Sequence, residues 1–281
     1  IFTIFVLLFL SVNFLQKKEE NLENITLPHT NNNPLSAFQK NCDDGMISSC
    51  IAVASIYEHG IPGVNQDYSK AAEIFQKACN NGNGKGCVKI GNLYKEGKGV
   101  VQDYSKSVES YQKAIELFRE SCNDGNNGEC VQLGTLYENG NGVEKDYSGA
   151  IKLYENACDN WNGKDSYGGC TELGKLYEYN YHDNSKAFVF YKKACDKDKS
   201  GHECTNLGHY MDSIDSFKAL VFYEKACDKG DFYGCFTLGR MYANGIGVKQ
   251  STEKALDIFG SICDKKRQEG CDEYAKLKHG G

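Results

Sequence analysis

The cysteines of this chain form seven close pairs at a nearly constant interval, and this spacing limits the possible folds more than any other feature. The two members of a pair are 8, 9 or 12 residues apart. The pairs are Cys42 and Cys50, Cys79 and Cys87, Cys122 and Cys130, Cys158 and Cys170, Cys195 and Cys204, Cys227 and Cys235, and Cys263 and Cys271. Their second members follow one another at intervals of 37, 43, 40, 34, 31 and 36 residues. Such a period is typical of stacked helical repeats, in which each unit buries its apolar face against its neighbours.

Each repeat carries two segments with the apolar spacing of an α-helix. The first begins near the second cysteine of a pair: Leu133 and Tyr137, three and seven positions after Cys130, share its helical face. A glycine four positions after the cysteine, such as Gly134, falls on the same face. Because glycine inside a helix costs about 1 kcal/mol relative to alanine, its recurrence predicts close approach by a neighbouring helix.

The second segment precedes the next cysteine pair and has apolar residues at offsets 0, 3, 7, 10 and 11, as in Tyr147–Cys158. An aspartate stands just before this segment in several repeats, and we expect Asp67, Asp103 and Asp146 to cap the helices. A Gly-x-Gly-Val sequence, such as residues 140–143, separates the two segments in three repeats. It predicts a tight turn with both glycines at positive φ.

The irregular repeats differ by insertions and deletions that a stack of helices tolerates. The 43-residue interval contains seven extra residues, Ile115–Ser121, in its second helix. Since seven residues are almost two helical turns, Cys122 is expected to keep its face. The 40-residue interval contains four extra residues in the loop near Trp161, and the intervals of 34 and 31 residues lack the glycine turn.

The pairing of the cysteines follows from their place in the repeat. The first cysteine ends a second helix, and its partner is expected about two turns into the next first helix. Asn, Asp and Gly residues between them predict a short helix–helix connection that a disulfide can bridge. Zinc sites favour two to four residues between cysteines, which no pair here has, and the six histidines do not recur in phase. We therefore predict one structural disulfide per repeat, no metal site and no cofactor.

The amino-terminal segment predicts export. Residues 1–10 read IFTIFVLLFL, and the apolar run continues weakly to Leu15 before charged residues begin at Lys17. A run this short fits a signal peptide better than a membrane span, and a buried or amphipathic helix is the alternative. The chain starts with Ile rather than Met, so we expect further residues before Ile1. We expect a signal-like segment over 1–15, a polar linker over 16–33 and one solenoid over 34–281, with about six full repeats and partial caps.

The repeats resemble the Sel1-like repeat, a relative of the tetratricopeptide repeat. Leu133–Tyr147 match the motif x-Leu-Gly-x-Leu-Tyr-x-x-Gly-x-Gly-Val-x-x-Asp-Tyr-x-Lys-Ala almost position by position, although Gly149 replaces the lysine. The likeness spans residues 36–279 and is weakest at 179–185 and 211–217, where the glycine turn is absent. It implies an all-α fold, a right-handed α-solenoid of antiparallel helix pairs.

A cysteine pair in every repeat of an exported chain is also similar to the Helicobacter cysteine-rich protein family. That resemblance implies β-lactam binding and β-lactamase activity, with catalytic residues that the sequence does not identify. Ser-x-x-Lys occurs at Ser110–Lys113 and Ser251–Lys254, about as often as chance predicts, without the Ser-Asp-Asn and Lys-Thr-Gly partners of serine β-lactamases. The alternative hypothesis is a non-catalytic scaffold that binds a peptide or protein.

A superhelix of helix pairs exposes a concave groove lined by its first helices. Offsets 5 and 8 from the second cysteine lie beside the core stripe and are expected to face this groove. These candidate groove residues are Asn92, Lys95, Thr135, Glu138, Lys175, Glu178, His209, Asp212, Arg240 and Ala243. Their mixed polar character suits a peptide or protein partner, and a solvated face without a partner is the alternative.

The charge and the location narrow the range of partners further. The formal net charge of −6 gives no electrostatic basis for binding nucleic acid. Export and a high cysteine content predict a secreted or periplasmic protein, because disulfides persist in oxidising compartments. We expect a monomer that meets the membrane only during export.

Overall fold

The computed structural model describes residues 34–161 and 168–279, and the described residues form 14 α-helices. The expected signal-like segment and linker lie outside these ranges, as does most of the loop after Trp161. The helices are α2 (Pro34–Asp43), α3 (Ile47–His59), α4 (Tyr68–Asn80), α5 (Gly84–Glu96), α6 (Tyr104–Asn123), α7 (Asn127–Asn139), α8 (Tyr147–Asn160), α9 (Gly169–Tyr179), α10 (Asn184–Lys197), α11 (His202–Asp212), α12 (Ser216–Asp228), α13 (Phe232–Asn244), α14 (Thr252–Asp264) and α15 (Gln268–His279).

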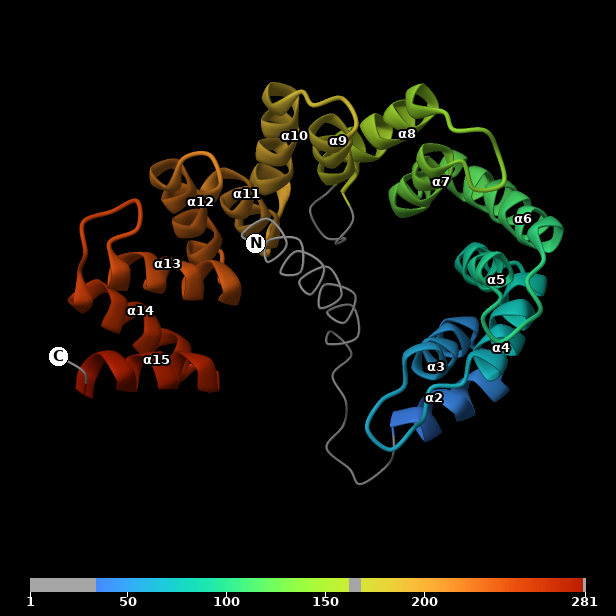
Figure 1. Cartoon of the computed structure of the whole chain (residues 1–281), viewed down its shortest axis with the longest axis horizontal. Coiled ribbons are helices and arrows are strands. Elements are labelled where there is room, and N and C mark those ends of the chain that lie inside the picture. The colour runs from blue at the N-terminus through green and yellow to red at the C-terminus, as the bar shows by residue number, and fades with distance from the viewer. Residues whose placement is uncertain (1–33, 162–167, 280–281) are drawn as a thin grey trace, which may run out of the picture.

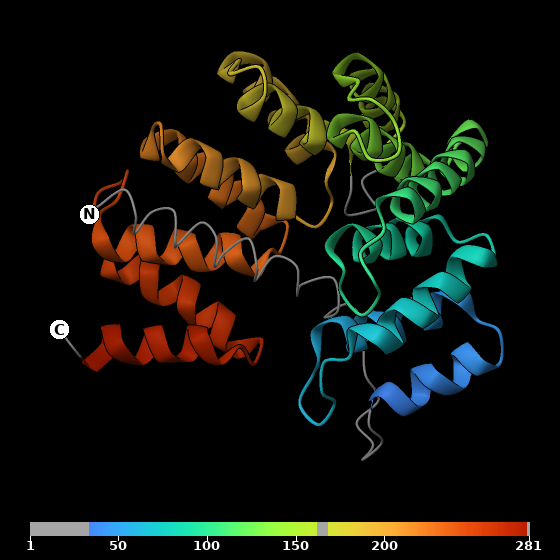
Figure 2. The same cartoon turned by 45° about the vertical axis from the view of Figure 1, so that its right-hand side comes forward.

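Consecutive helices pack against each other and form a curved stack. Each first helix, from α3 to α13, packs against the second helix that follows it, and α2 and α15 flank the stack. Figure 1 shows α5, α7 and α11 towards the inner side of an arc, with α6, α8 and α12 outside them, whereas α9 and α10 lie side by side. Figures 1 and 2 both place α2 and α15 at the two ends of the arc, on its open side. The predicted all-α, right-handed solenoid of antiparallel helix pairs is confirmed.

The predicted helix starts are capped as expected. Asp67, Asp103 and Asp146 each accept a hydrogen bond of 2.8–3.0 Å from the backbone N–H three residues later. Asp183 and Asp215 make equivalent caps in the two repeats that lack the glycine turn. The carboxylate satisfies an N–H that would otherwise lack a partner in the first helical turn.

The three predicted glycine turns also form. The two glycines of each turn, at positions 97 and 99, 140 and 142, and 245 and 247, have φ between 66° and 78°. The first glycine of each pair ends the preceding helix in the left-handed conformation. The chain therefore reverses direction between the first and the second helix through two glycines. Residues with a side chain would be strained at these positive φ angles.

All 14 cysteines are paired in the seven predicted disulfides. Each bond joins the last turn of one helix to the first turn of the next, with Cα atoms 4.3–4.7 Å apart. The expectation that the second cysteine lies two turns into its helix is wrong. Cys87 is in the first turn of α5, because Asn83 accepts a hydrogen bond from Gly86 N–H and the helix begins only at Gly84.

The seven-residue insertion lengthens one helix, as predicted. α6 has 20 residues, whereas the other second helices of the stack have 13 or 14. Cys122 remains buried and bonded to Cys130, because almost two added turns return it to its original face. The added turns also bury Ile115 and Phe118.

Candidate functional site

An aromatic ring from the second helix packs on the recurring glycine of the first helix in five consecutive repeats. A Cβ atom added at the glycine would lie 2.5–3.0 Å from the ring. The contacts join Gly91 to Tyr111, Gly134 to Tyr154, Gly174 to Tyr191, Gly208 to Tyr223 and Gly239 to Phe259. The close helix approach predicted from these glycines is therefore confirmed. Glycine is needed because an aromatic ring of the second helix occupies the space that a Cβ atom would fill.

Four of these rings are tyrosines, and their hydroxyl groups reach side chains of the predicted groove stripe. The hydroxyl contacts join Tyr111 to Asn92 (2.5 Å), Tyr154 to Glu138 (2.7 Å) and Thr135 (3.2 Å), Tyr191 to Glu178 (2.7 Å) and Tyr223 to His209 (2.9 Å). Each tyrosine thus extends from the buried core to a candidate groove residue of the first helix. Five of the candidate groove residues are held in position by a buried tyrosine.

The environment of these tyrosines keeps them protonated. Burial raises the pKa of Tyr154 and Tyr191 far above the ordinary value, and the adjacent carboxylates of Glu138 and Glu178 raise it further. The phenols therefore act as neutral hydrogen-bond donors rather than as bases or nucleophiles. Burial also raises the pKa of Glu138, against the opposing effect of its hydrogen bond from Tyr154.

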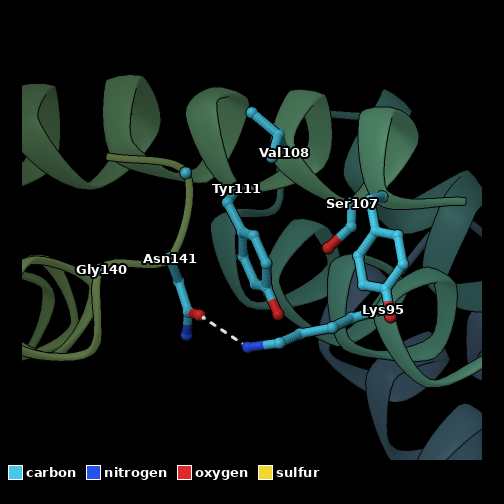
Figure 3. Close-up of a pocket in the computed structure, with 8 residues that line it drawn as sticks. Lys95, Ser107, Val108, Tyr111, Gly140 and Asn141 are labelled. Carbon is cyan, nitrogen blue, oxygen red and sulfur yellow. Dashed lines mark hydrogen bonds between the residues drawn. The ribbon is translucent and has the colours of Figure 1, made fainter. Parts of the chain in front are cut away.

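Lys95 lines a shallow cavity between α5, α6 and the turn that connects α7 to α8. Figure 3 shows its side chain extending past Tyr111 to Asn141 in the α7–α8 turn, with Nζ 3.3 Å from Oδ1. Ser107 and Val108 also line this cavity, whose volume is about 110 Å³. Sites for drug-sized ligands are usually about 300–1,000 Å³, so this part of the face suits an extended surface contact better than an enclosed ligand.

The remaining candidate groove residues lack a tyrosine partner. The Nζ atom of Lys175 lies 2.8 Å from Oε1 of Glu172, one turn earlier on α9. Asp212 and Arg240 are exposed, and Ala243 is half-buried. These positions leave charged groups accessible on α9, α11 and α13.

A buried carboxylate between two first helices was not predicted. Glu203 on α11 is 5 % exposed, and its Oε2 accepts a hydrogen bond of 2.8 Å from Thr171 Oγ1 on α9. Asn206 Nδ2 donates to the same oxygen at 3.2 Å. Glu203 and Thr171 each stand next to a buried cysteine in the sequence. A polar residue beside a buried position is the only feature of the sequence that indicates this hydrogen bond.

Both Ser-x-x-Lys serines have structural roles. Ser110 is buried and donates a 2.7 Å hydrogen bond to the carbonyl oxygen of Lys106. Ser251 caps α14 by accepting a hydrogen bond from the N–H of Lys254. Within residues 34–161 and 168–279, no cluster of His, Cys, Asp and Glu is arranged to hold a metal ion. Neither serine sits in a recognisable acylation site.

These features define a class of protein, a disulfide-stapled helical-repeat scaffold. Six consecutive segments match the Sel1 repeat, at residues 47–83, 84–126, 130–160, 169–199, 203–231 and 233–265. The chain belongs to the Sel1 repeat family. The narrower resemblance to the Helicobacter cysteine-rich proteins is compatible with one disulfide per repeat and stays a prediction. Comparison with curated proteins gives no match.

Solved structures with similar folds come from several bacteria. A Sel1 repeat protein from Oxalobacter formigenes is 23% identical, with 91% of this chain and 97% of that chain covered and a TM-score of 0.47. A protective antigen of uropathogenic Escherichia coli with an SLR fold is 25% identical, with 85% of this chain covered and a TM-score of 0.44. The present chain spans 50% of the length of that antigen. An immunity protein from Pseudomonas aeruginosa is 20% identical over 82% of this chain and 81% of its own, with a TM-score of 0.45.

Proposed function

We propose that this protein is a non-catalytic scaffold that binds a peptide or protein segment along the inner face of its arc. The observation that carries this proposal is the row of buried tyrosines that hold five polar side chains on four successive first helices. Side chains that are ordered before binding lose less conformational entropy when a partner docks. Sel1 and related repeat proteins commonly mediate protein–protein interactions, which supports the same function.

The charges along the inner face suggest what the bound segment carries. Glu138 on α7 and Glu178 on α9 place carboxylates near the middle of the stack, where Lys175 is already paired with Glu172. Lys95 on α5 and Arg240 on α13 lie nearer its ends. Complementary potentials favour specific association. We therefore expect a segment with basic residues at its centre and acidic residues towards its ends.

The proposed place of action is outside the cytoplasm, either secreted or periplasmic. Seven disulfides support this location, because such bonds persist in oxidising compartments. No helix of the described ranges is long and apolar enough to cross a bilayer. We propose that residues 1–15 direct export, that residues 16–33 form a linker, and that the monomer, which carries the whole inner face, is the binding form.

Site-specific photo-crosslinking tests the binding face. A benzoylphenylalanine in place of Lys175 on the first helix α9 is expected to capture a partner from an envelope extract. The matched probe replaces Val189, a residue of the second helix α10 whose side chain is 59 % exposed. This probe is expected to capture much less of the partner. The charge reversals Lys95→Glu and Arg240→Glu should then weaken binding of the captured partner. Equal capture at both positions, or unchanged affinity after both reversals, would contradict the proposal.

The catalytic reading is tested separately with nitrocefin. Oxidised protein is expected to show no turnover above buffer, since Ser110 and Ser251 are engaged in structural hydrogen bonds. Turnover that rises in proportion to protein purity and survives metal chelation would show that the protein is a hydrolase.

A further inference from the structure

The added turns of α6 form one wall of a second cavity, separate from the groove stripe. Leu117, Phe118 and Ser121, all within the seven-residue insertion, line a notch of about 410 Å³. Ile51 on α3 and Glu129 on α7 also line it, as do the residues around Gly84 where α5 begins. The volume falls within the usual range for ligand sites. The repeat that departs from the common length is therefore the repeat that builds a cavity.

The apolar part of the notch has a fixed shape. Phe118 is buried, and its ring lies against Gly84, where an added Cβ would be only 2.3 Å from the ring. Leu117 and Ile51 are half-buried beside it. Leu117 and Ile51 offer an apolar surface for the stem of a ligand, and Phe118 fixes the floor beneath them.

The polar part of the notch contains an unsatisfied acceptor. Oε2 of Glu129 is buried and has no hydrogen-bond partner among the described residues. Lys85 also lines the notch but does not donate to this oxygen. A buried carboxylate oxygen without a donor is destabilising, so a ligand that supplies an N–H would gain the full hydrogen bond.

We infer that this notch binds an arginine side chain of a docked peptide, with the guanidinium donating to Glu129 and the aliphatic stem packed on Leu117 and Ile51. A guanidinium fits because its planar fork matches a carboxylate and its weak hydration favours a partly buried pair. The inference rests on the proposed function, since it assigns a residue of the bound peptide. It adds a second contact region, at the amino-terminal ends of α3, α5 and α7, whereas the tyrosine-held side chains lie in the later turns of their helices.

The test uses N-acetyl-arginine amide and the oxidised full chain. Its uncharged isostere, N-acetyl-citrulline amide, is the matched ligand, and both are titrated into the millimolar range expected for one side chain. Amide signals of Gly82, Gly84 and Ser121 should shift in ¹H–¹⁵N spectra with the arginine probe only. Glu129→Gln should weaken binding roughly ten-fold through loss of a charged hydrogen bond. Glu116→Gln, which changes an exposed glutamate of α6 outside the notch, should leave the affinity unchanged.

Three results would overturn the inference. Equal shifts with citrulline would remove the need for charge, and unchanged affinity in a well-folded Glu129→Gln variant would remove the assigned acceptor. Shifts of the same amides with N-acetyl-aspartate amide alone would show an anion site at Lys85 instead. The crosslinking at Lys175 does not use the notch, so failure of the arginine probe with successful crosslinking refutes this inference alone. If the arginine probe binds but the crosslinker at Lys175 captures no partner, the proposed function and the docked peptide are both refuted. The notch would then be a site for a free guanidinium compound.

Discussion

A single glycine in each first helix sets how closely the two helices of a repeat approach. We predict that Gly134→Ala lowers the free energy of unfolding by about 1–3 kcal/mol, because its Cβ would lie 2.6 Å from the Tyr154 ring. This steric cost outweighs the gain of about 1 kcal/mol in helix propensity. Denaturant unfolding of the oxidised protein measures the change.

The matched control lies in the same helix. A Cβ at Gly128 would meet only Asn126 Oδ1, at 3.5 Å. Gly128→Ala should therefore be neutral or stabilising by up to about 1 kcal/mol. Equal effects of the two substitutions would show that contact with the ring does not decide the glycine requirement.

Glu138 is expected to make stability depend on pH. Burial raises its pKa in the folded protein above the unfolded value, so its ionisation opposes folding as pH rises through the range between them. Glu138→Gln keeps an acceptor for Tyr154 and removes the charge. The variant should have the higher thermal midpoint at pH 7, and the difference should shrink as pH falls towards 4.5. A difference that is constant with pH would contradict this assignment.

At the scale of the helix pair, the disulfides supply stability that short helices lack. Isolated helices of 11 to 14 residues are marginal in water. Removing one bond with Cys79→Ala and Cys87→Ala together should lower the free energy of unfolding by about 2–3 kcal/mol, the chain-entropy value for a nine-residue loop. Comparison of wild type and double variant in oxidant and then in reductant checks this. The difference between them should largely vanish once the wild type is reduced.

Lysine side chains add a second link between neighbouring repeats. Nζ of Lys197 donates to the carbonyl oxygens of Cys158 and Asp159 at 2.7 and 2.8 Å, which lie at the end of α8. We predict that Lys197→Met costs about 1–3 kcal/mol, because two carbonyl oxygens at a helix end, one of them part-buried, lose a charged donor. The exposed Lys199, changed to Met, should alter stability by less than about 0.5 kcal/mol in the same chemical-denaturation assay.

The sequence predicts the elements better than the contacts between them. The spacing of the cysteine pairs, the capping aspartates such as Asp67 and the two glycines of each turn are local features of the sequence. The order of the helices and all seven disulfides can therefore be predicted from the spacing of these residues. The start of α5 was missed because Asn83 caps it with a side chain that the apolar pattern does not register.

The side-chain contacts between helices could not be predicted from the sequence. Gly134 predicts a close helix, but the choice of Glu138 as hydroxyl acceptor depends on the tilt of the Tyr154 ring. The Thr171–Glu203 bond joins residues 32 positions apart, so it depends on the curvature of the stack. The notch depends on the same curvature, since it combines side chains from α3, α6 and α7.

At the scale of the whole molecule, stability should vary along the stack. Each inner repeat packs on two neighbours, whereas α2 and α15 pack on one side only. We predict that hydrogen exchange in α7 to α11 is slower, by on the order of ten-fold or more, than in α2 and α15. Mass spectrometry of exchanged peptides would show this gradient. Uniform protection from end to end would instead mean that the stack opens only as a unit.

The short span of every disulfide has a consequence for how the protein matures. Fourteen cysteines permit on the order of 10⁵ pairings, yet each native bond joins cysteines only 8, 9 or 12 residues apart. Each bond can therefore close as soon as its hairpin has emerged, before the next cysteine pair is available. Oxidation can proceed in the order of synthesis, with little need for an isomerase to correct long-range mispairing.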